Sequence, residues 1–407
     1  MNDPDAQNIQ AISDWLIEKG LRQTPVPAMV AGFCERLVAA GVPLLRVNVS
    51  ARTMHPLIDS ISNVWRRDRT MEARANTFED QNHERWQGSP LRVIVETMDT
   101  RLHRTDLTDP AQTASWKVFQ EFRNEGATEH VIRLVGFGVD GKLTNRTGVM
   151  MTWLTDRPGG FSDRDIAVLE RMMPRLALSV KSTVDHEIAV NLLDTYLGHQ
   201  AGAAILGGSY RRGTFRIIPA AILFADLRGF SGLSDRLDRE SMADLLNACF
   251  DAMVTPIRRH GGEVLKFLGD GLLAVFDREG HEDADICFGA LHAAVAACEG
   301  VALVPVPGET GTTMELDVAL HLGEVYYGNV GAADRLDFTV LGPAVNEAAR
   351  IEALCGELDT NLLISHSFAQ AARHCSPHIA PAGRHVLRGL AEPVELFTLR
   401  QGALEGA

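Results

Sequence analysis

The chain has 407 residues, of which 45% are hydrophobic and 23% charged, and its formal net charge is −14. This length suits about two or three domains of ordinary globular composition. The negative charge argues against nucleic acid or an anionic membrane surface as the main partner, and no apolar run approaches the ~18 residues of a membrane helix. The opening segment MNDPDAQNIQ lacks the features of a signal peptide, so we expect a cytoplasmic protein without membrane insertion.

The six cysteines show no C-x-x-C pairing and mostly occupy helical or apolar contexts. We expect reduced, buried thiols, as is usual in the cytoplasm, and neither disulfides nor a zinc site. Cys34 lies in the helical segment FCER, where a packed thiol is favoured over chromophore attachment or redox sensing.

Residues 1–175 are predicted to form a separate α+β domain. Helical periodicity comes first, followed by β-like segments around a turn and then by a second helical stretch with an N-cap signal. The expected elements are helices at Ile9–Lys19 and Val26–Ala40, a strand at Pro43–Ser50, strands at Glu129–Phe137 and Gly148–Thr155 around the turn at residues 140–141, and a helix at Phe161–Val180 capped by Ser162.

This order of helices and antiparallel strands resembles a GAF-type sensor domain, with a PAS-like fold as the alternative. The resemblance implies a small molecule or other signal at this domain, and haem, bilin and cyclic nucleotide stay open as ligands. Trp65, Trp86, Trp116, Trp153 and Phe137 would line a pocket or, as aromatic residues in sheet domains more often do, form the core.

Residues 176–215 are predicted to form a helical linker. Its first part carries an apolar seam with i, i+4 spacing, which favours a parallel two-helix coil between two copies of the chain. A segment rich in Gly and Arg follows and leads into the next domain. The seam consists of Leu176, Val180, Val184, Ile188 and Leu192.

In residues 216–407, two aspartates each follow an apolar β-type segment. Ala220–Ala225 is typical of a buried strand and ends just before Asp226, while Gly269-Asp270-Gly271 between two apolar runs predicts a hairpin tip. Either aspartate alone would be an ordinary turn residue. Together, two converging carboxylates suit Mg²⁺ or Mn²⁺, and such ions suit phosphoryl or nucleotidyl transfer.

A third segment strengthens the case that Asp226 and Asp270 belong to a functional site. Asp337–Leu341 predicts a strand, and a helix is expected from Ala344 after a Gly-Pro break. Asn346 and Arg350 are four residues apart on one face of that helix. Arg350 alone would be a solvated surface residue, but Arg and Asn on one face also suit a charged transition state.

Together these segments resemble the catalytic domain of the class III nucleotide cyclases over about Pro219–Leu399. The motifs are FADLRGF at 224–230, KFLGDG at 266–271, and DFTVLG at 337–342 followed by Asn346 and Arg350. The resemblance implies an α/β fold with a ferredoxin-like mixed sheet, and formation of 3′,5′-cyclic AMP and pyrophosphate from ATP. The 3′-hydroxyl attacks the α-phosphate of the same molecule, so positioning and electrostatics supply the catalysis.

The resemblance also implies roles for the matching residues. The metal ligands of one site come from one subunit and the remaining groups from the other, which implies a homodimer with two interface sites. By this resemblance Asp226, Asp270 and the carbonyl of Leu227 bind two Mg²⁺ or Mn²⁺ ions, and Lys266 and Thr339 bind the purine. Asn346 orients the ribose and Arg350 stabilises charge on the α-phosphate. Arg388 binds the triphosphate, with Arg384 as the alternative.

Lys266 and Thr339 favour ATP over GTP. Adenine offers a ring acceptor and an amino donor, which match an ammonium that donates and a hydroxyl that accepts. Thr339 resembles the subgroup whose best-known members respond to bicarbonate, and Pro343 departs from the Asp usual in the family. The alternative functions are a guanylate cyclase, a catalytically degenerate nucleotide-binding signalling module, and an interaction protein built around the coil.

Overall fold

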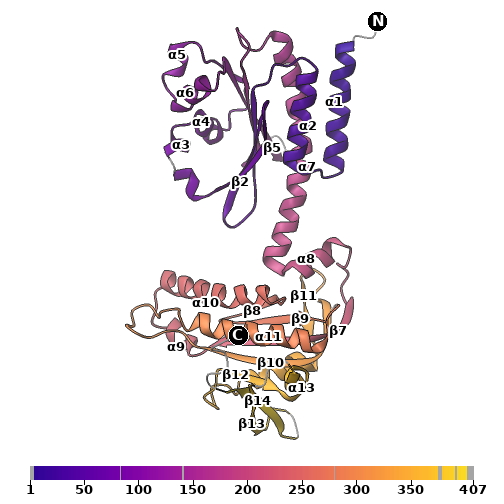
Figure 1. Ribbon diagram of the computed structural model, residues 1–407, viewed down its shortest axis with the longest axis vertical. Coiled ribbons are helices and arrows are strands. Elements are labelled where there is room, and N and C mark those ends of the chain that lie inside the picture. The colour runs from indigo at the N-terminus through magenta and orange to yellow at the C-terminus, as the bar shows by residue number, and fades with distance from the viewer. Residues whose placement is uncertain are drawn as a thin grey trace. The chain divides into compact units, whose positions relative to one another are not determined.

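The computed structural model describes residues 4–82, 84–139, 142–278, 280–374, 378–389 and 392–400. The chain divides into two compact units, Met1–Leu192 and Leu193–Ala407, each of which combines helices with a sheet (Figure 1). This arrangement confirms the predicted α/β class.

The first unit contains an antiparallel sheet in the order β3-β2-β1-β6-β5-β4. The first strand begins at Arg46 instead of Pro43, and the turn expected at 140–141 lies outside the described residues. The strands are β1 (Arg46–Arg52), β2 (Ile58–Arg66), β3 (Arg69–Thr77), β4 (His103–Asp106), β5 (Glu129–Val139) and β6 (Lys142–Thr155). The helices are α1 (Pro4–Leu21), α2 (Val26–Ala39), η1 (Glu79–Asn82), α3 (Glu84–Gln87), α4 (Pro90–Thr97), α5 (Pro110–Thr113), α6 (Lys117–Asn124) and α7 (Asp163–Leu197).

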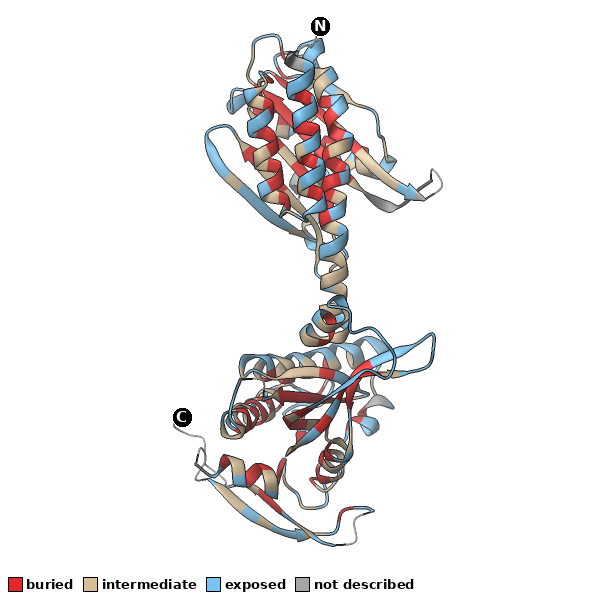
Figure 2. Ribbon diagram, turned by 90° about the vertical axis from the view of Figure 1, so that its right-hand side faces the viewer, coloured by how far each residue is buried: buried red, intermediate tan, exposed pale blue. Residues whose placement is uncertain are grey.

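Alternate residues of the central strands face two different layers of helices. Val131 and Trp153 pack with α1, α2 and α7, whereas Ile132 and Met150 pack with α4. Figure 2 shows the buried residues in red, between the helices and the sheet. A sheet covered on both faces requires this period of two, because successive side chains of a strand point to opposite sides.

Helix α7 begins with the predicted cap. The Ser162 hydroxyl accepts a hydrogen bond from the Asp165 amide at 3.3 Å, and the Asp165 carboxylate accepts one from the Ser162 amide at 2.9 Å. This reciprocal pair satisfies two amide groups that the first helical turn leaves without partners.

Beyond its cap, α7 runs through Pro174 to Leu197, so the predicted helix over Phe161–Val180 and the helical first part of the expected linker form one helix. The division between the two units falls within it. Leu176 and Val180, expected in a coil seam, are instead fully buried in the core of the first unit. Their burial offsets the free-energy cost of the backbone hydrogen bond that Pro174 cannot donate. Packing of an apolar face contributes more to the stability of a helix than local propensity does.

The second unit has a sheet in the order β13-β14-β12-β10-β7-β9-β8, with β11 paired to β10. Only the pairing of β10 with β12 is parallel among the pairings of the described strands. The strands are β7 (Phe215–Leu227), β8 (Glu263–Leu268), β9 (Gly271–Asp277), β10 (Leu316–Gly331), β11 (Leu336–Leu341), β12 (Leu362–Ser365), β13 (Ile379–His385) and β14 (Val394–Leu399). The helices are α8 (His199–Leu206), α9 (Phe230–Ser234), α10 (Arg239–Arg259), α11 (Asp283–Val301), α12 (Pro343–Glu352), α13 (His366–Ala371) and η2 (Ala372–His374).

The closing hairpin differs from the prediction, which ran over Val386–Leu399. Its strands are β13 and β14, so residues 386–388 lie in the connection after β13. Leu387 is buried there against Leu363 and Leu396, which draws the chain off the sheet edge and into the core.

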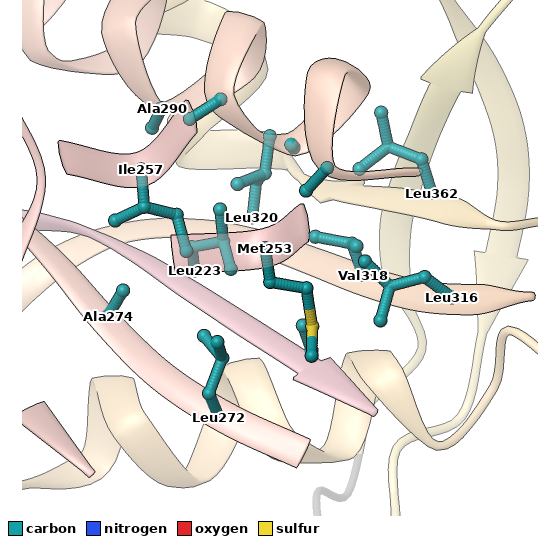
Figure 3. Packing of buried hydrophobic residues seen from close by; sticks show 14 of the residues in the cluster. Leu223, Met253, Ile257, Leu272, Ala274, Ala290, Leu316, Val318, Leu320 and Leu362 are labelled. Carbon is teal, nitrogen blue, oxygen red and sulfur yellow. The ribbon is translucent and has the colours of Figure 1, made fainter. Parts of the chain in front are cut away.

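Strand β7 lies between two apolar layers and sets the direction of the site residues. Leu223 packs with Met253 of α10 and with Leu320 (Figure 3), whereas Ile222 packs in the layer beneath α8 and α12. Successive side chains of a strand point to opposite faces, so Asp226 lies on the same face as Ile222, the face that α12 covers.

The second half of the expected linker belongs to the fold of the second unit. The Glu263 carboxylate accepts a hydrogen bond from the Gln200 amide at 2.7 Å, at the start of α8. The Asn329 side chain donates to the Ser209 carbonyl at 2.5 Å, and its backbone carbonyl accepts from the Gly213 amide at 3.0 Å. The segment from α8 to β7 is therefore tied to strands β8 and β10.

Helix α11 is the one helix in the described ranges that could cross a membrane by length and composition, although the apolar run lengths did not suggest it. Cys287, Leu291 and Ala294 of this helix are buried in the core formed with β7, β9 and β10. That position is typical of a core helix.

Cys34, Cys249, Cys298 and Cys355 form no disulfide, and Cys375 lies outside the described residues. Cys34, Cys249, Cys287 and Cys355 are buried. Burial raises the pKa of the Cys34 thiol well above its ordinary value, as expected for a packed side chain.

Substitution of Trp153 tests the first core. Trp153 is fully buried, and its ring meets Phe33 edge-on with the centroids 6.1 Å apart. We expect Trp153→Ala to lower the free energy of unfolding by about 3–5 kcal/mol. Trp153→Phe should cost much less, because Nε1 of Trp153 has no hydrogen-bond partner among the described residues.

Urea unfolding of the full chain, followed by tryptophan fluorescence, measures this effect because all five tryptophans lie in the first unit. Equal losses from the Ala and Phe variants would contradict the assignment of Trp153 to an apolar packing role.

Candidate active site

The site begins where β7 and β10 end side by side. Asp226 of β7 is directly opposite Asp317 of β10 in the antiparallel register. Like charges in this position repel each other. Leu227 follows with its side chain buried in the core, so only its backbone carbonyl can serve as a ligand.

Arg228 neutralises Asp317, a pairing for which the sequence carries no local signal. Its Nε and Nη2 atoms donate to the Asp317 carboxylate at 3.1 and 2.6 Å. Its Nη1 atom donates to Glu315 at 3.1 Å, and Nη2 also donates to the Thr360 carbonyl at 3.2 Å. Arg228 donates to these partners and not to Asp226. Asp226 makes no hydrogen bond or ion pair with a described residue.

The predicted hairpin tip brings Asp270 to the same place. Strands β8 and β9 pair as far as Leu268 and Gly271, with Gly269 in a left-handed conformation at φ +69°. A Cβ atom on Gly271 would lie 2.4 Å from the Ala225 carbonyl oxygen and 2.6 Å from Oδ1 of Asp226. Only glycine permits this approach, which places the tip against the end of β7.

A fourth acidic residue, Glu352 at the end of α12, completes what we call the acidic cluster: Asp226, Asp270, Asp317 and Glu352. Burial, then Asp270 and Asp317, raise the pKa of Asp226 to about 6. Burial, then Asp226, Asp317 and Asp270, raise the pKa of Glu352 to about 7. Glu352 was missed from the sequence, where its only signal is its place on the helix that carries Arg350.

The acidic cluster favours a hard divalent cation. Asp226 and Asp270 supply carboxylate oxygens, and the carbonyl of Leu227 adds a third ligand of the same type, as Mg²⁺ and Mn²⁺ prefer. Within the described ranges, no three His, Cys, Asp or Glu side chains form a ready metal-binding group. Mg²⁺ usually keeps several waters beside one or two carboxylates, so Asp226 and Asp270 could hold such an ion.

Lys266 and Thr339 lie on neighbouring parts of the second unit. Nζ of Lys266 on β8 is 2.5 Å from Oδ2 of Asp337 on β11. Thr339 is two residues further along β11. Since Phe338 and Val340 pack into the apolar layer beneath α8 and α12, Asp337 and Thr339 lie on the opposite face of that strand.

Helix α12 has the predicted Pro343 in its first turn and carries both Asn346 and Arg350. Asn346 is exposed. A Cβ atom on Gly389 would lie 3.7 Å from Nη2 of Arg350, so the connection after β13 lies beside this guanidinium group.

The same contact distinguishes the two arginines considered for the triphosphate. Arg388 precedes Gly389, is exposed, and makes no hydrogen bond or ion pair with a described residue. Arg384 donates to the Pro393 carbonyl of its own hairpin at 2.9 Å. The geometry therefore favours Arg388 as the cation near Arg350.

The eight site residues fall into three groups in one chain. No hydrogen bond or ion pair between described residues joins one group to another. The groups are Asp226, Leu227 and Asp270 at the acidic cluster; Lys266 and Thr339 on β8 and β11; and Asn346, Arg350 and Arg388 around α12 and the connection after β13.

Residues 216–401 match the family of the adenylate and guanylate cyclase catalytic domain. The second unit therefore carries an adenylyl/guanylyl cyclase catalytic domain of class III.

The chain is 34% identical over 152 residues to the adenylate cyclase of Anabaena cylindrica, covering 36% of this chain and 29% of that relative. It is 27% identical over 278 residues to adenylate cyclase 2 of Rhizobium meliloti, covering 67% of this chain and 71% of the relative. The crystal structure of the adenylyl cyclase CyaB from P. aeruginosa is 24% identical with a TM-score of 0.40, covering 46% of this chain and 96% of that one. The chain thus spans less than a third of the Anabaena protein.

The close approach at Gly271 predicts a sharp effect of one methyl group. In Gly271→Ala, the contact with the Ala225 carbonyl would push the hairpin tip and Asp270 away from Asp226. We expect a loss of cyclase activity of about 100-fold, the scale of a displacement near 1 Å. Gly269→Ala is the matched control: its Cβ meets nothing within 4 Å, and its left-handed backbone costs only about 1–2 kcal/mol of stability. Equal activity of the two variants would contradict this geometry.

The raised pKa of Asp226 predicts how the metal-free protein responds to pH. Its ordinary value is 3.8 and its value in the folded chain about 6. The folded state therefore binds this proton more tightly than the unfolded state, and stability is lost as the pH rises from about 4 to about 6.

Asp226→Asn cannot ionise, so its melting temperature in EDTA should exceed that of the wild type by a few degrees at about pH 8 and approach it near pH 4. The exposed Asp251→Asn serves as the control and should show no such trend. A difference between Asp226→Asn and wild type that does not change with pH would refute the charge argument.

Proposed function

We propose that this protein is an adenylate cyclase that converts ATP to 3′,5′-cyclic AMP and pyrophosphate at two sites of a homodimer. The observation that carries the proposal is the hairpin tip against the end of β7, which places Asp270 beside Asp226 on a cyclase catalytic domain. The named adenylate cyclases among the relatives support the same activity.

Asp226, Asp270 and the Leu227 carbonyl would hold two Mg²⁺ or Mn²⁺ ions. When bound, such ions lower the pKa of the attacking hydroxyl and neutralise the leaving phosphates. Asp226 would also receive the proton of the 3′-hydroxyl.

The remaining groups act on the substrate directly. Arg350 stabilises the charge that develops at the α-phosphate, and Asn346 orients the ribose. Arg388 binds the triphosphate, for which its exposed guanidinium, without a partner among the described residues, is suited. These local cations matter because the chain has a net charge of −14 and its substrate is also anionic.

Lys266 and Thr339 select adenine. The Lys266 ammonium donates to N1 of the ring, and the Thr339 hydroxyl accepts from the N6 amino group. Guanine has a ring N–H where adenine has its acceptor, so Lys266 opposes it. We therefore expect ATP to be the preferred substrate over GTP.

A second copy of the chain completes each site. In one chain no hydrogen bond or ion pair between described residues joins the three groups of site residues, and the family arrangement joins the acidic cluster of one subunit to the other groups of its partner. Exposed apolar side chains on β8 and β11 support an interface at these strands. They are Phe267, Leu268, Leu336 and Leu341, which are 37–50% exposed.

The first unit is proposed to be a GAF-like sensor that regulates the cyclase. A cleft of 780 Å³ lies between α4, β4, α5 and α6, a volume suited to a small molecule. Trp116 and Phe119 line it, whereas Trp65 and Trp153 belong to the core instead. Arg101 and His103 form its polar end with Asp99, whose carboxylate is 2.6 Å from Nη2 of Arg101 and 3.0 Å from Nε2 of His103.

The activity is tested by cyclic nucleotide production from ATP and from GTP by the purified full chain, with Mg²⁺ or Mn²⁺. We expect cyclic AMP, and a decrease of about 100–1,000-fold in Asp270→Ala and in Arg350→Ala. Asp251→Ala, on an exposed position of α10, should keep the wild-type rate. Binding of ATP without any product would instead identify a degenerate nucleotide-binding module.

Mixing the two inactive variants tests the shared site. If metal ligands and Arg350 come from different subunits, each mixed dimer contains one intact site, and equal mixing should restore about one quarter of the wild-type activity. No recovery after confirmed subunit exchange would place the whole site within one chain.

A further inference from the structure

We propose that the second unit holds a separate binding site for a linear aliphatic diamine, in a cavity at the end of strand β12. The cavity has a volume of 390 Å³, which is within the range of small-molecule sites. Its lining comes from β10, α12, β14 and the junction of β12 with α13, and it includes none of the eight site residues described above. The inference therefore goes beyond the proposed cyclase activity and does not depend on it.

The cavity exists because β12 is short. This strand lies between β10 and β14 and ends at Ser365, where α13 begins. Strand β10 continues past that point, and β14 begins at Val394, before the Leu396 that pairs with Ser365. Two strand spacings, roughly 10 Å, therefore separate β10 from β14 where no strand lies between them. The Ser367 hydroxyl donates to the Leu322 carbonyl of β10 at 2.8 Å, so α13 covers only part of this gap.

A buried histidine without a hydrogen-bond partner lines the cavity. His321 of β10 is 7% exposed, and its Nδ1 atom makes no hydrogen bond with a described residue. Nδ1 is 3.8 Å from Oε1 of Glu347 on α12, which is too far for a hydrogen bond. Burial lowers the pKa of His321 against the opposing effect of Glu347, so the ring is neutral at about pH 7. We place its hydrogen on Nε2, which makes Nδ1 an acceptor.

This pair of acceptors favours a ligand that carries N–H groups. A buried polar atom without a partner costs free energy, and a donor that reaches it removes that cost. A primary ammonium group has three donors and a positive charge. It would satisfy Nδ1 of His321 and the Glu347 carboxylate together.

A second histidine and glutamate line the cavity from α13 and β14. The Glu395 carboxylate accepts a hydrogen bond from Nδ1 of His366 at 3.1 Å, and Nε2 of His366 accepts one from the Gln370 amide at 2.7 Å. An ionised carboxylate accepts several hydrogen bonds, so Glu395 keeps acceptor sites for a ligand. Arg384 is opposite Glu395 on β13, but its Nη2 atom donates to the Pro393 carbonyl at 2.9 Å.

The two carboxylates belong to opposite faces of the sheet. Leu396 of β14 packs with Ile351 of α12. Its neighbour Phe397 packs in the core with Phe368 of α13. Glu395, two residues before Phe397, is therefore on the α13 face, because the side chains of a strand alternate. The glutamate of α12 is on the other face, so a ligand that meets both passes through the gap between β10 and β14.

These features together define the class of ligand. Among the described residues that line the cavity there are two glutamates and neither lysine nor arginine, so the site favours a cation. One ammonium group at each carboxylate requires a diamine, and the side chains of Leu322, Val394 and Leu396 supply apolar surface for its methylene chain. A metal ion fits less well, because no three His, Cys, Asp or Glu side chains of the described residues form a metal-binding group.

Calorimetric titration of the purified full chain with 1,4-diaminobutane, in EDTA and without nucleotide, tests the site. Glu347→Gln and Glu395→Gln each remove one negative charge and keep the size of the side chain, so each should weaken binding about tenfold. Glu357→Gln, at an exposed position after α12, is the matched control and should bind as wild type. 1-Aminobutane, which has a single ammonium group, should bind about tenfold more weakly than the diamine, and 1,4-butanediol should not bind.

The acidic cluster is the competing place for a diamine on this chain, and Asp270→Asn distinguishes the two. This variant should bind the diamine as wild type does. A loss of affinity in Asp270→Asn together with wild-type affinity in Glu347→Gln would place the diamine at the acidic cluster and overturn the inference. No binding to the wild type, or affinities within about twofold of wild type in both glutamate variants, would overturn it as well. Melting temperatures in the same buffer verify that each variant is folded.

Discussion

Repulsion between carboxylates at the end of β7 is the constraint on which the site depends. Asp226 and Asp317 are opposite each other in the register, and the hairpin tip adds Asp270. Within the acidic cluster, Arg228 pairs with Asp317 and not with Asp226. The fold thus contains negative charge that it does not neutralise itself, and any cation that binds there also stabilises the folded state by linkage. Metal affinity and stability of the second unit are therefore two aspects of one electrostatic balance.

The features predicted from sequence are those with a local signal. The strand before Asp226, the turn at Asp270 and the helix bearing Arg350 each depend on neighbouring residues, and the structure contains all three. Pairs joined by the register of distant strands carried no such signal. Arg228 and Asp317 are 89 residues apart in sequence, and Lys266 and Asp337 are 71 apart.

The errors have the same origin. Leu176 and Val180 of α7 have the spacing of a coil seam, but contacts with distant segments bury them in the core of the first unit. The connection after β13 leaves the sheet because Leu387 is buried against Leu363 and Leu396, which no local pattern specifies. Both features depend on tertiary packing, which propensities and turn motifs describe poorly.

The hydrogen bonds that tie residues 198–214 to the second unit have a consequence for control. Glu263, which binds the start of α8, is on the same strand as Lys266, and Asn329, which binds Ser209, is opposite Phe338, next to Thr339. A displacement of this segment would therefore reach β8 and β11, the strands proposed to read the base, before it reaches the carboxylates. Control through such a route would change the apparent affinity for substrate more than the maximal rate, which is the behaviour of a K-type allosteric enzyme.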